Sequence, residues 1–383
     1  MSVSRMAIHL PDSLLADLNR RLDATRWPDE IEGAGWSQGT DLAYMRALAA
    51  YWRQGFDWRR QEAALNALPQ VRVAVDGLRI HAVHIRGRGP KPLPLVITHG
   101  WPGSFVEMVK IVPLLTDPAA HGGSADDAFD VVVPSLPGYG FSDRPGARGM
   151  NPRRIAGLWV KLMAALGYER FAAQGGDWGS AVSSALGLDH ADRVLGIHLN
   201  FIVGRFLLGG SLATAREDED TREFLGTLRA WWDSEGGYNH EQGTKPQTLG
   251  YGLNDSPVGL AAWIVEKFRT WSDCSGDVER AFTRDELLTN VMIYWATETA
   301  VSSTRLYFES REAPLSLTPD SRVNVPVAVA LFPKEIPMPP RALAERGYNI
   351  KRWTAMPRGG HFAAMEQPEL LAEDVKEFFR ELR

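Results

Sequence analysis

The chain has 383 residues, of which 44% are hydrophobic and 23% charged, and its formal net charge is -5 with the nine histidines neutral. This composition is that of a globular protein with a substantial core, and its acidic balance argues against a nucleic-acid or anionic-membrane partner. The single cysteine, Cys274, excludes an internal disulfide. No apolar run approaches the roughly 20 residues that span a bilayer, and the N-terminus lacks the apolar core of a secretion signal. We therefore expect a cytoplasmic protein without a membrane anchor.

The first seventy residues predict mostly helix, and a β-hairpin follows them. Leucines recur at helical spacing after Pro11, and a second helical run covers about 41–67. Residues 71–75 and 78–85 alternate in polarity on either side of the turn Asp76-Gly77, a pattern that favours a hairpin.

From Leu93 onwards, short apolar strands alternate with helices. The predicted strands cover 93–98, 129–133, the run that ends at Ala173, and 194–201; the helices between them cover 104–116, 152–166 and the residues after Asp177. Such alternation is typical of a parallel sheet with helices on both faces.

The alternation stops near Gly204. Residues 205–318 carry helical periodicity, several tryptophans and no clear strand, and the alternation then resumes with strands at 325–331 and 349–355. A helix near 339–346 and a final helix over 368–382 complete the chain. The sequence thus predicts an α/β domain over 91–203 and 319–383, interrupted after its fifth or sixth strand by a helical insert over 204–318.

Asp177 occupies the centre of the motif Gly175-Gly176-Asp177-Trp178-Gly179, between a predicted strand and a predicted helix. This is the setting of a nucleophile elbow, in which glycines leave room for a sharp turn. A free carboxylate has a pKa of about 3.9 and is ionised at neutral pH. It can therefore attack an electrophilic carbon without help from a base and form an ester on the enzyme. The alternative is an aspartate that only caps the following helix.

An ester on the enzyme must be hydrolysed, and the water that does so needs a base. Histidine suits this task, and His361, which follows Arg358-Gly359-Gly360 late in the chain, has the expected position. A carboxylate usually orients such a histidine. Glu335 is well placed after the strand 325–331, whereas Asp320 precedes that strand and Glu366 is too close to His361 in the chain. The alternatives are a surface histidine for His361 and a solvated loop charge for Glu335.

A second motif, His99-Gly100-Trp101-Pro102-Gly103-Ser104, follows the strand 93–98. A His-Gly turn at this point commonly supplies one N–H of an oxyanion hole, and the residue after the nucleophile supplies another. The backbone N–H groups of Trp101 and Trp178 are therefore the candidates, while we expect His99 to be structural. Trp101-Pro102 is a candidate for a cis peptide bond.

The insert contains tyrosines that can donate a hydrogen bond to a leaving oxygen while keeping their proton at neutral pH. Four are candidates by residue type, and most tyrosines serve only in packing. Spacing alone does not choose among Tyr238, Tyr251, Tyr294 and Tyr307.

Taken together, these motifs resemble those of the microsomal-type epoxide hydrolases of the α/β-hydrolase superfamily, and the likeness extends over nearly the whole chain. It is carried by the Asp177 and His99 motifs, by Gly359-Gly360-His361-Phe362-Ala363-Ala364, and by segments of the insert such as Gly237-Tyr238-Asn239-His240. The resemblance implies an N-terminal extension over residues 1–90 that wraps the core, and a cap formed by the insert. It also places the family's two ring-opening tyrosines on Tyr238 and Tyr307, its nucleophile on Asp177, its base on His361 and its acid on Glu335.

The resemblance further implies an enzyme that converts a small, hydrophobic or aromatic epoxide to a vicinal diol without a metal or other cofactor. A homodimer is expected by family analogy alone. Two other functions share parts of the pattern. A haloalkane dehalogenase would use the same aspartate and histidine but would need N–H donors for a halide, and a non-catalytic binding protein would need only the scaffold.

Overall fold

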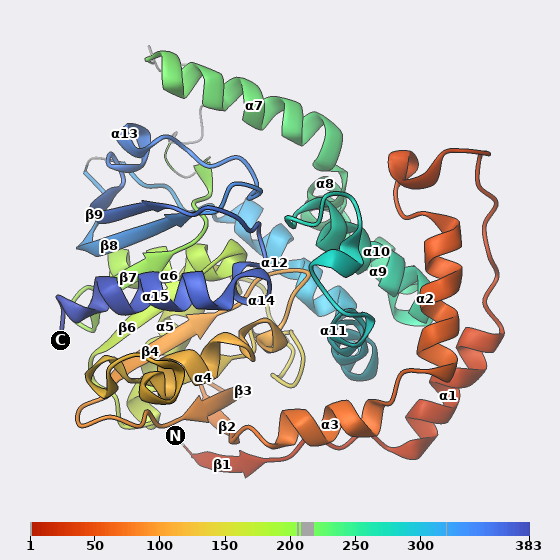
Figure 1. Ribbon diagram of the computed structural model, residues 1–383, viewed down its shortest axis with the longest axis horizontal. Helices are drawn as coiled ribbons and strands as arrows, with labels where there is room; N and C mark the ends of the chain where they lie inside the picture. The colour runs from red at the N-terminus through yellow and green to blue at the C-terminus, as the bar shows by residue number, and fades with distance from the viewer. Residues whose placement is uncertain (1, 205–206, 208–217, 319) are drawn as a thin grey trace.

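The computed structural model describes residues 2–204, 207, 218–318 and 320–383, and within these residues a nine-stranded sheet forms the centre of the molecule (Figure 1). The strand order is β1-β2-β3-β5-β4-β6-β7-β8-β9. The strands are β1 (Val3–Met6), β2 (Gln70–Val75), β3 (Leu78–Ile85), β4 (Leu93–Thr98), β5 (Phe129–Pro134), β6 (Phe171–Gly175), β7 (Val194–Leu199), β8 (Val323–Leu331) and β9 (Tyr348–Ala355). β1, β2 and β3 pair in antiparallel fashion, and β3 is also antiparallel to β5. The six remaining strands, in the order β5-β4-β6-β7-β8-β9, are parallel to one another. The predicted, mostly parallel α/β sheet is therefore confirmed.

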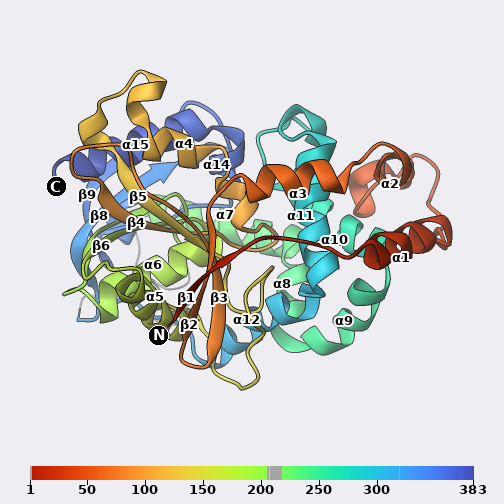
Figure 2. The same ribbon diagram turned by 90° about the horizontal axis from the view of Figure 1, so that it is seen from below.

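Helices cover both faces of this sheet because its central strands are apolar on both sides (Figure 2). α5 and α6 pack together on one face, and α4 and α15 pack together on the other. These helices are α4 (Ile111–Thr116), α5 (Pro152–Ala165), α6 (Asp177–Asp189) and α15 (Pro368–Arg380), with the short α13 (Arg341–Ala344) and α14 (Ala363–Glu366) in the loops after β8 and β9. The helix expected over 104–116 is instead a 3-10 turn at Phe105–Met108 followed by α4.

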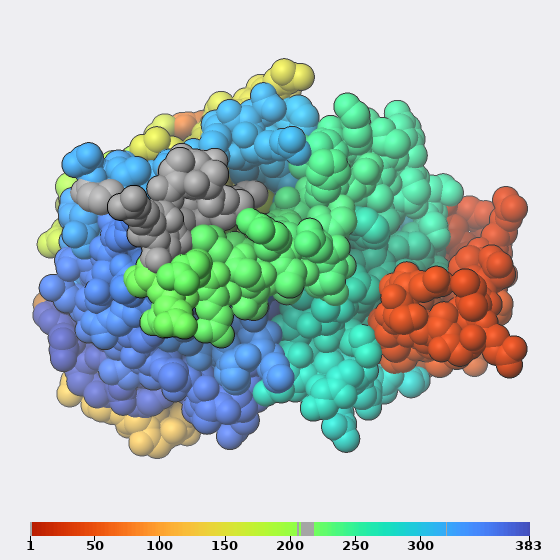
Figure 3. All heavy atoms as spheres, turned by 90° about the horizontal axis from the view of Figure 1, so that it is seen from above, coloured from red at the N-terminus to blue at the C-terminus, as the bar shows by residue number. Residues whose placement is uncertain are grey.

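The helices between β7 and β8 are called the cap helices here. They are α7 (Glu219–Glu235), α8 (Gly237–Thr244), α9 (Pro246–Asp255), α10 (Pro257–Thr270), α11 (Arg284–Thr297) and α12 (Ala300–Glu312). α7 lies on the surface against the C-terminal part of the core (Figure 3). The predicted helical character is confirmed for the described residues of this insert, although it follows the seventh strand of the chain because β1 was not expected.

The N-terminal extension joins the sheet to the cap. Its strands β1 to β3 lie at one edge of the sheet, and its helices run along the cap helices (Figures 1 and 2). These helices are α1 (Asp12–Asp23), α2 (Leu42–Gln54) and α3 (Trp58–Asn66), with a 3-10 turn at Gly35–Gln38. The helical run expected over 41–67 is broken after Gln54, because the Asp57 side chain accepts the N–H of Arg60 and starts a new helix there.

Candidate active site

Asp177 lies at the turn between β6 and α6, at the carboxyl end of the sheet. Its φ of 45° is left-handed, a conformation that few residues other than glycine adopt. The neighbouring glycines allow α6 to lie close to the sheet, since a Cβ on Gly179 would overlap the carbonyl oxygen of Thr98 and one on Gly175 would overlap Gly179. The motif therefore builds the elbow expected from the sequence and exposes the carboxylate to the space above the strands.

Two backbone N–H groups hydrogen-bond this carboxylate. The N–H of Trp101, at the end of β4, donates to Oδ1 of Asp177 over 2.8 Å, and the N–H of Trp178 also hydrogen-bonds the carboxylate. Burial raises the pKa of Asp177 above its ordinary value, whereas the charge of His361 and these two N–H groups act to lower it. The peptide bond between Trp101 and Pro102, for which the sequence analysis proposed a cis geometry, is cis.

His361 and Glu335 come from the loops after β9 and β8. Nδ1 of His361 lies 2.5 Å from Oε1 of Glu335, and Nε2 lies 3.6 Å from Oδ2 of Asp177. The two loops are held together by the N–H of Lys334, which donates to the carbonyl of Gly359 over 3.0 Å. Both side chains of the pair are almost fully buried, so the structure brings these candidates together in the order carboxylate, imidazole, carboxylate.

This arrangement places one imidazole among three carboxyl groups. Burial by itself lowers the pKa of His361, but the charges of Glu335, Asp177 and Glu107 outweigh it and raise the pKa to about 9. Burial raises the pKa of Glu335, and the charge and hydrogen bond of His361 lower it. With this raised pKa, His361 carries a proton at neutral pH, and Glu335 contributes most to that, followed by Asp177.

Tyr238 from α8 and Tyr307 from α12 face the same carboxylate from the cap side. Both tyrosines and Asp177 line one cavity, together with Trp178, Phe201, Val203, Trp231, Trp232, Asn239 and Ile336. The two phenol rings lie 5.9 Å apart, and the ring of Tyr238 stacks on that of Trp101 at 5.4 Å. The Tyr307 hydroxyl is buried, and its O–H donates to no group that the structure describes, although the indole N–H of Trp178 acts on its oxygen. The O–H is therefore available to donate to a ligand.

The other sequence candidates lie elsewhere. Tyr251 is 73% exposed, and the hydroxyl of Tyr294 donates to the carbonyl of Gly103 over 2.6 Å. Glu366 accepts the N–H groups of Asp273 and Phe362, and Asp320 precedes β8 at the opposite end of that strand. His99 is buried and binds the backbone through both ring nitrogens, which agrees with a structural role.

Comparison with known proteins identifies the family. Residues 3–108 match the family model for the epoxide hydrolase N terminus, and residues 94–232 match that for the alpha/beta hydrolase fold. The chain is 47% identical to a putative epoxide hydrolase of Stigmatella aurantiaca over 100% of this chain and 86% of that protein. The chain belongs to the epoxide hydrolase family.

Other epoxide hydrolases agree with this result. Epoxide hydrolase 1 of Oryctolagus cuniculus is 40% identical over 98% of this chain and 88% of that protein. The crystal structure of juvenile hormone epoxide hydrolase from Bombyx mori matches with a TM-score of 0.85 at 31% identity, covering 100% of this chain and 94% of that one. The Aspergillus niger epoxide hydrolase matches with a TM-score of 0.87 at 28% identity, covering 100% and 97%. The chain therefore has the epoxide hydrolase fold, with its N-terminal extension and cap.

The sequence analysis missed Glu107, a buried acid near Asp177 that does not line the aromatic cavity. It lines a smaller cavity with Asp177, His361, Gln174 and Asn200. Burial raises the pKa of Glu107 to about 8, against the lowering effect of the charge of His361. The position of Glu107 near Asp177 and His361 is visible only in the folded structure. There the Glu107 carboxylate occupies the space beside Gly103, where a Cβ would overlap it.

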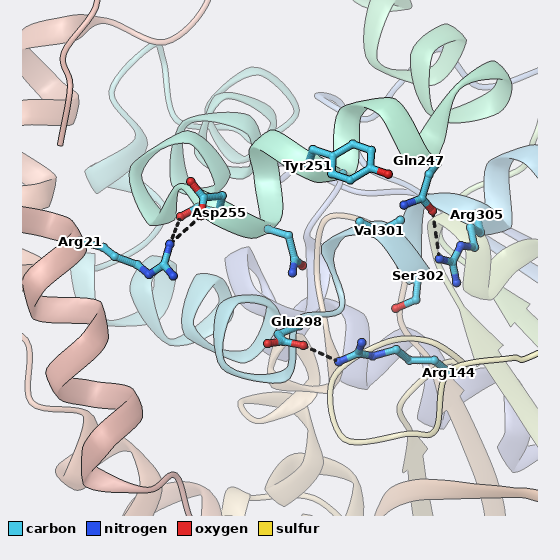
Figure 4. Close-up of a pocket in the computed structure, with 11 residues that line it drawn as sticks. Arg21, Arg144, Gln247, Tyr251, Asp255, Glu298, Val301, Ser302 and Arg305 are labelled. Atoms are coloured by element: carbon cyan, nitrogen blue, oxygen red, sulfur yellow. Dashed lines mark hydrogen bonds and ion pairs between the residues drawn. The ribbon is translucent and has the colours of Figure 1, made fainter. Parts of the chain in front are cut away.

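A different pocket opens at the surface, where α1, α9, α12 and the loop that carries Arg144 meet (Figure 4). Its arginines are engaged, since Arg21 pairs with Asp255 and Arg144 with Glu298. None of the candidate catalytic residues lines this pocket. Within the described part of the chain, no group of three or more His, Cys, Asp or Glu residues could hold a metal ion, and no helix is long and apolar enough to cross a membrane.

Proposed function

We propose that this member of the epoxide hydrolase family uses Asp177 as nucleophile, Tyr238 and Tyr307 as hydrogen-bond donors to the epoxide oxygen, and His361 with Glu335 as the base. The observation that carries the proposal is the placement of the Asp177 carboxylate between two phenols on one side and an imidazole on the other. An epoxide in the aromatic cavity can thus meet the nucleophile and the proton donors at once.

The first step forms an ester. Oδ1 of Asp177 is held by the N–H of Trp101, so Oδ2 is the oxygen available to attack a ring carbon. The C–O bond of the ring breaks as the new C–O bond forms, and the phenols stabilise the departing oxygen. Because the phenols are oxygen-binding donors, the cavity suits an alkoxide leaving group better than a halide.

The second step cleaves that ester. Alkylation removes the negative charge of Asp177, which is one of the charges that raise the pKa of His361. The imidazole therefore loses its proton more readily in the ester state and can accept one from water. When that water attacks Cγ of Asp177, the charge develops on Oδ1, where the N–H of Trp101 stabilises it; the N–H of Trp178 is the second donor to this carboxyl group.

The cavity supports a substrate that is uncharged and apolar. Among the described residues that line it, Asp177 is the sole charged group, and the others are mostly aromatic or aliphatic. Aryl and alkyl epoxides fit this lining, since apolar walls bind apolar substituents and leave orientation to a few polar groups. The expected homodimer and cytoplasmic location stay predictions.

The decisive experiment is mass spectrometry of His361→Gln after incubation with a panel of aryl and alkyl epoxides. Ester formation needs no base and should survive, whereas ester hydrolysis should slow by about 10²–10⁴-fold. The Asp177 peptide should then carry an adduct of the substrate's mass. Absence of an adduct with every epoxide, while the parent enzyme turns the same compounds over, would refute Asp177 as the nucleophile.

A further inference from the structure

The two proposed proton donors have different surroundings. Tyr307 packs edge-on against the ring of Trp178 at 4.8 Å, and burial, followed by the charges of Tyr238 and Asp177, raises the pKa of Tyr307 well above its ordinary value. Tyr238 has a cation as a neighbour: Nζ of Lys267 lies 5.1 Å from the centre of its ring, and 5.6 Å from that of Trp271. Neither sequence motifs nor the resemblance pointed to Lys267.

Lys267 is buried, which is uncommon for this residue type. It belongs to α10, and its ammonium is held by Glu266 of the same helix at 2.6 Å and by Glu235 of α7 at 3.4 Å. These contacts fix the ammonium beside the Tyr238 ring, on the cap side of the cavity. A cation within about 6 Å of an aromatic ring is attracted to the ring's electrons, and the attraction is stronger when the pair is desolvated.

Such a cation acts differently on a phenol and on a phenolate. A phenol that gives up its proton gains negative charge, part of which is delocalised into the ring, so a nearby ammonium stabilises the deprotonated form more than the neutral one. We propose that the Lys267 ammonium activates Tyr238, so that Tyr238 transfers its proton to the opening epoxide oxygen while Tyr307 orients that oxygen by hydrogen bonding. Lys267 is thus a positioning residue that acts through Tyr238.

The protons balance over the cycle. In the first step the O–H bond of Tyr238 breaks, the hydroxyl of the ester forms, and a phenolate is left beside Lys267. The ester removes the charge of Asp177, so the protonated His361 then passes its proton to this phenolate through solvent, which leaves both groups neutral. In the second step His361 takes one proton from water, and the alcohol leaves with the other, which restores the imidazolium beside the Asp177 carboxylate. The inference rests on the proposed function, because it assigns the proton of the same ring-opening step.

The test measures ester formation in the His361→Gln background, where the adduct accumulates. Adding Lys267→Met should slow ester formation by about tenfold, the size expected for a buried cation–π contact, while Lys267→Arg should restore most of the rate. The slowing should appear in the rate constant for ester formation and not in the concentration of epoxide needed for half-saturation. An unchanged rate in folded Lys267→Met would overturn the proposal.

Glu235→Gln is the matched control for a purely structural role. It removes the carboxylate that ties α10 to α7 but leaves the ammonium less neutralised. Activation of Tyr238 predicts that this variant forms the ester at least as fast as the parent, whereas a role as a tether predicts slowing in both Glu235→Gln and Lys267→Met. Equal slowing of the two would therefore contradict the proposal, and Glu235→Gln decides the matter even if Lys267→Met fails to fold.

A double-mutant cycle locates the effect. Tyr238→Phe should remove the dependence on Lys267, whereas Tyr307→Phe should leave it intact. If Lys267→Met slowed ester formation equally in the Tyr238→Phe and Tyr307→Phe backgrounds, Lys267 would not act through Tyr238. Failure of the proposed function is distinguishable from all these outcomes, because it would leave no ester in the His361→Gln parent.

Discussion

Among the described residues, two histidines each form a buried pair with a carboxylate of a glutamate or aspartate outside the nucleophile elbow. His361 and Glu335 lie 2.5 Å apart above the carboxyl ends of the strands, and His198 and Asp374 lie 2.9 Å apart where β7 meets α15. All four side chains are almost fully buried. The pairs are thus alike in composition and burial, yet the first adjoins Asp177, the proposed nucleophile, and lines a cavity with it.

The difference lies in the second nitrogen of each ring and in the neighbours of each acid. Nε2 of His361 lies 3.6 Å from the Asp177 carboxylate, whereas Nδ1 of His198 is buried with no hydrogen-bond partner among the described residues. Asp374 also accepts from Arg352 and Thr354. Burial raises the pKa of Asp374, but the hydrogen bond and charge of His198 and the hydrogen bonds of Thr354 and Arg352 lower it to about 2.

Position in the sheet explains this contrast. His361 and Glu335 come from loops that follow strands, and the space beyond the carboxyl ends of parallel strands is where such sheets bind ligands. His198 lies inside β7, where packing fills every direction. We infer that a buried histidine–carboxylate pair inside a strand serves structure alone. Such a pair can take part in a reaction where the second ring nitrogen of the histidine faces a cavity.

Glu335→Gln should give the largest effect that the comparison predicts. Among the groups that raise the pKa of His361, Glu335 is the strongest, so its removal lowers that pKa. Ester hydrolysis needs the neutral imidazole; the acid limb of its pH profile should therefore move to lower pH, while the maximal rate falls by about 10²–10⁴-fold because the ring loses its orientation. Single-turnover hydrolysis of the ester across pH measures both. A limb that stays in place or moves to higher pH would contradict the role of Glu335.

Asp374→Ala should instead lower stability and leave catalysis intact. It strips His198 and Arg352 of a buried anion, and breaking such a pair costs about 3 kcal/mol in the free energy of unfolding. The contribution is fully present at pH 7, because a lowered acid pKa stabilises the fold above the unfolded value of about 3.9. Urea unfolding at pH 7 gives the loss, with Thr354→Val as a milder control. A fall in kcat as large as that of Glu335→Gln would erase the distinction between the two pairs.

Lys161→Ala should give the smallest effect. Lys161 pairs with Asp76 at 2.6 Å, but both side chains are about half exposed. Exposed ion pairs contribute about 0–1 kcal/mol, so we expect a change in the free energy of unfolding of about 0.5 kcal/mol or less. The same urea titration measures it, and a loss equal to that of Asp374→Ala would show that burial is not what separates strong pairs from weak ones.

Local patterns predicted the parts of the fold and the site that depend on one segment at a time. The alternation from Leu93 onwards predicted the parallel sheet, and strand–turn–helix placed Asp177 at an elbow. Late position in the chain placed His361 in a loop after a strand. These inferences succeed because burial on both faces leaves continuous apolar runs, and because a sharp turn requires glycine.

Features that depend on contacts between distant segments could not be predicted in this way. β1 is only four residues long and exposed along most of its length, so it carries little periodicity. The phenols of Tyr238 and Tyr307 meet only because α8 packs against α12, and spacing had left four tyrosines open. Glu107 approaches the site through the space left by Gly103. Lys267 approaches it because α10 brings this lysine beside Tyr238 of α8. Neither contact can be read from a single stretch of sequence.

The N-terminal extension has a consequence for how the molecule melts. Its strands belong to the central sheet, while Arg21 binds Asp255, Thr40 binds the carbonyl of Ala262, and Tyr51 binds Asp285, all on cap helices. One continuous segment thus contacts both the sheet and the cap. Losing the cap would remove these contacts from the extension and weaken the sheet edge that it supplies, so the chain should denature cooperatively, as one thermodynamic unit.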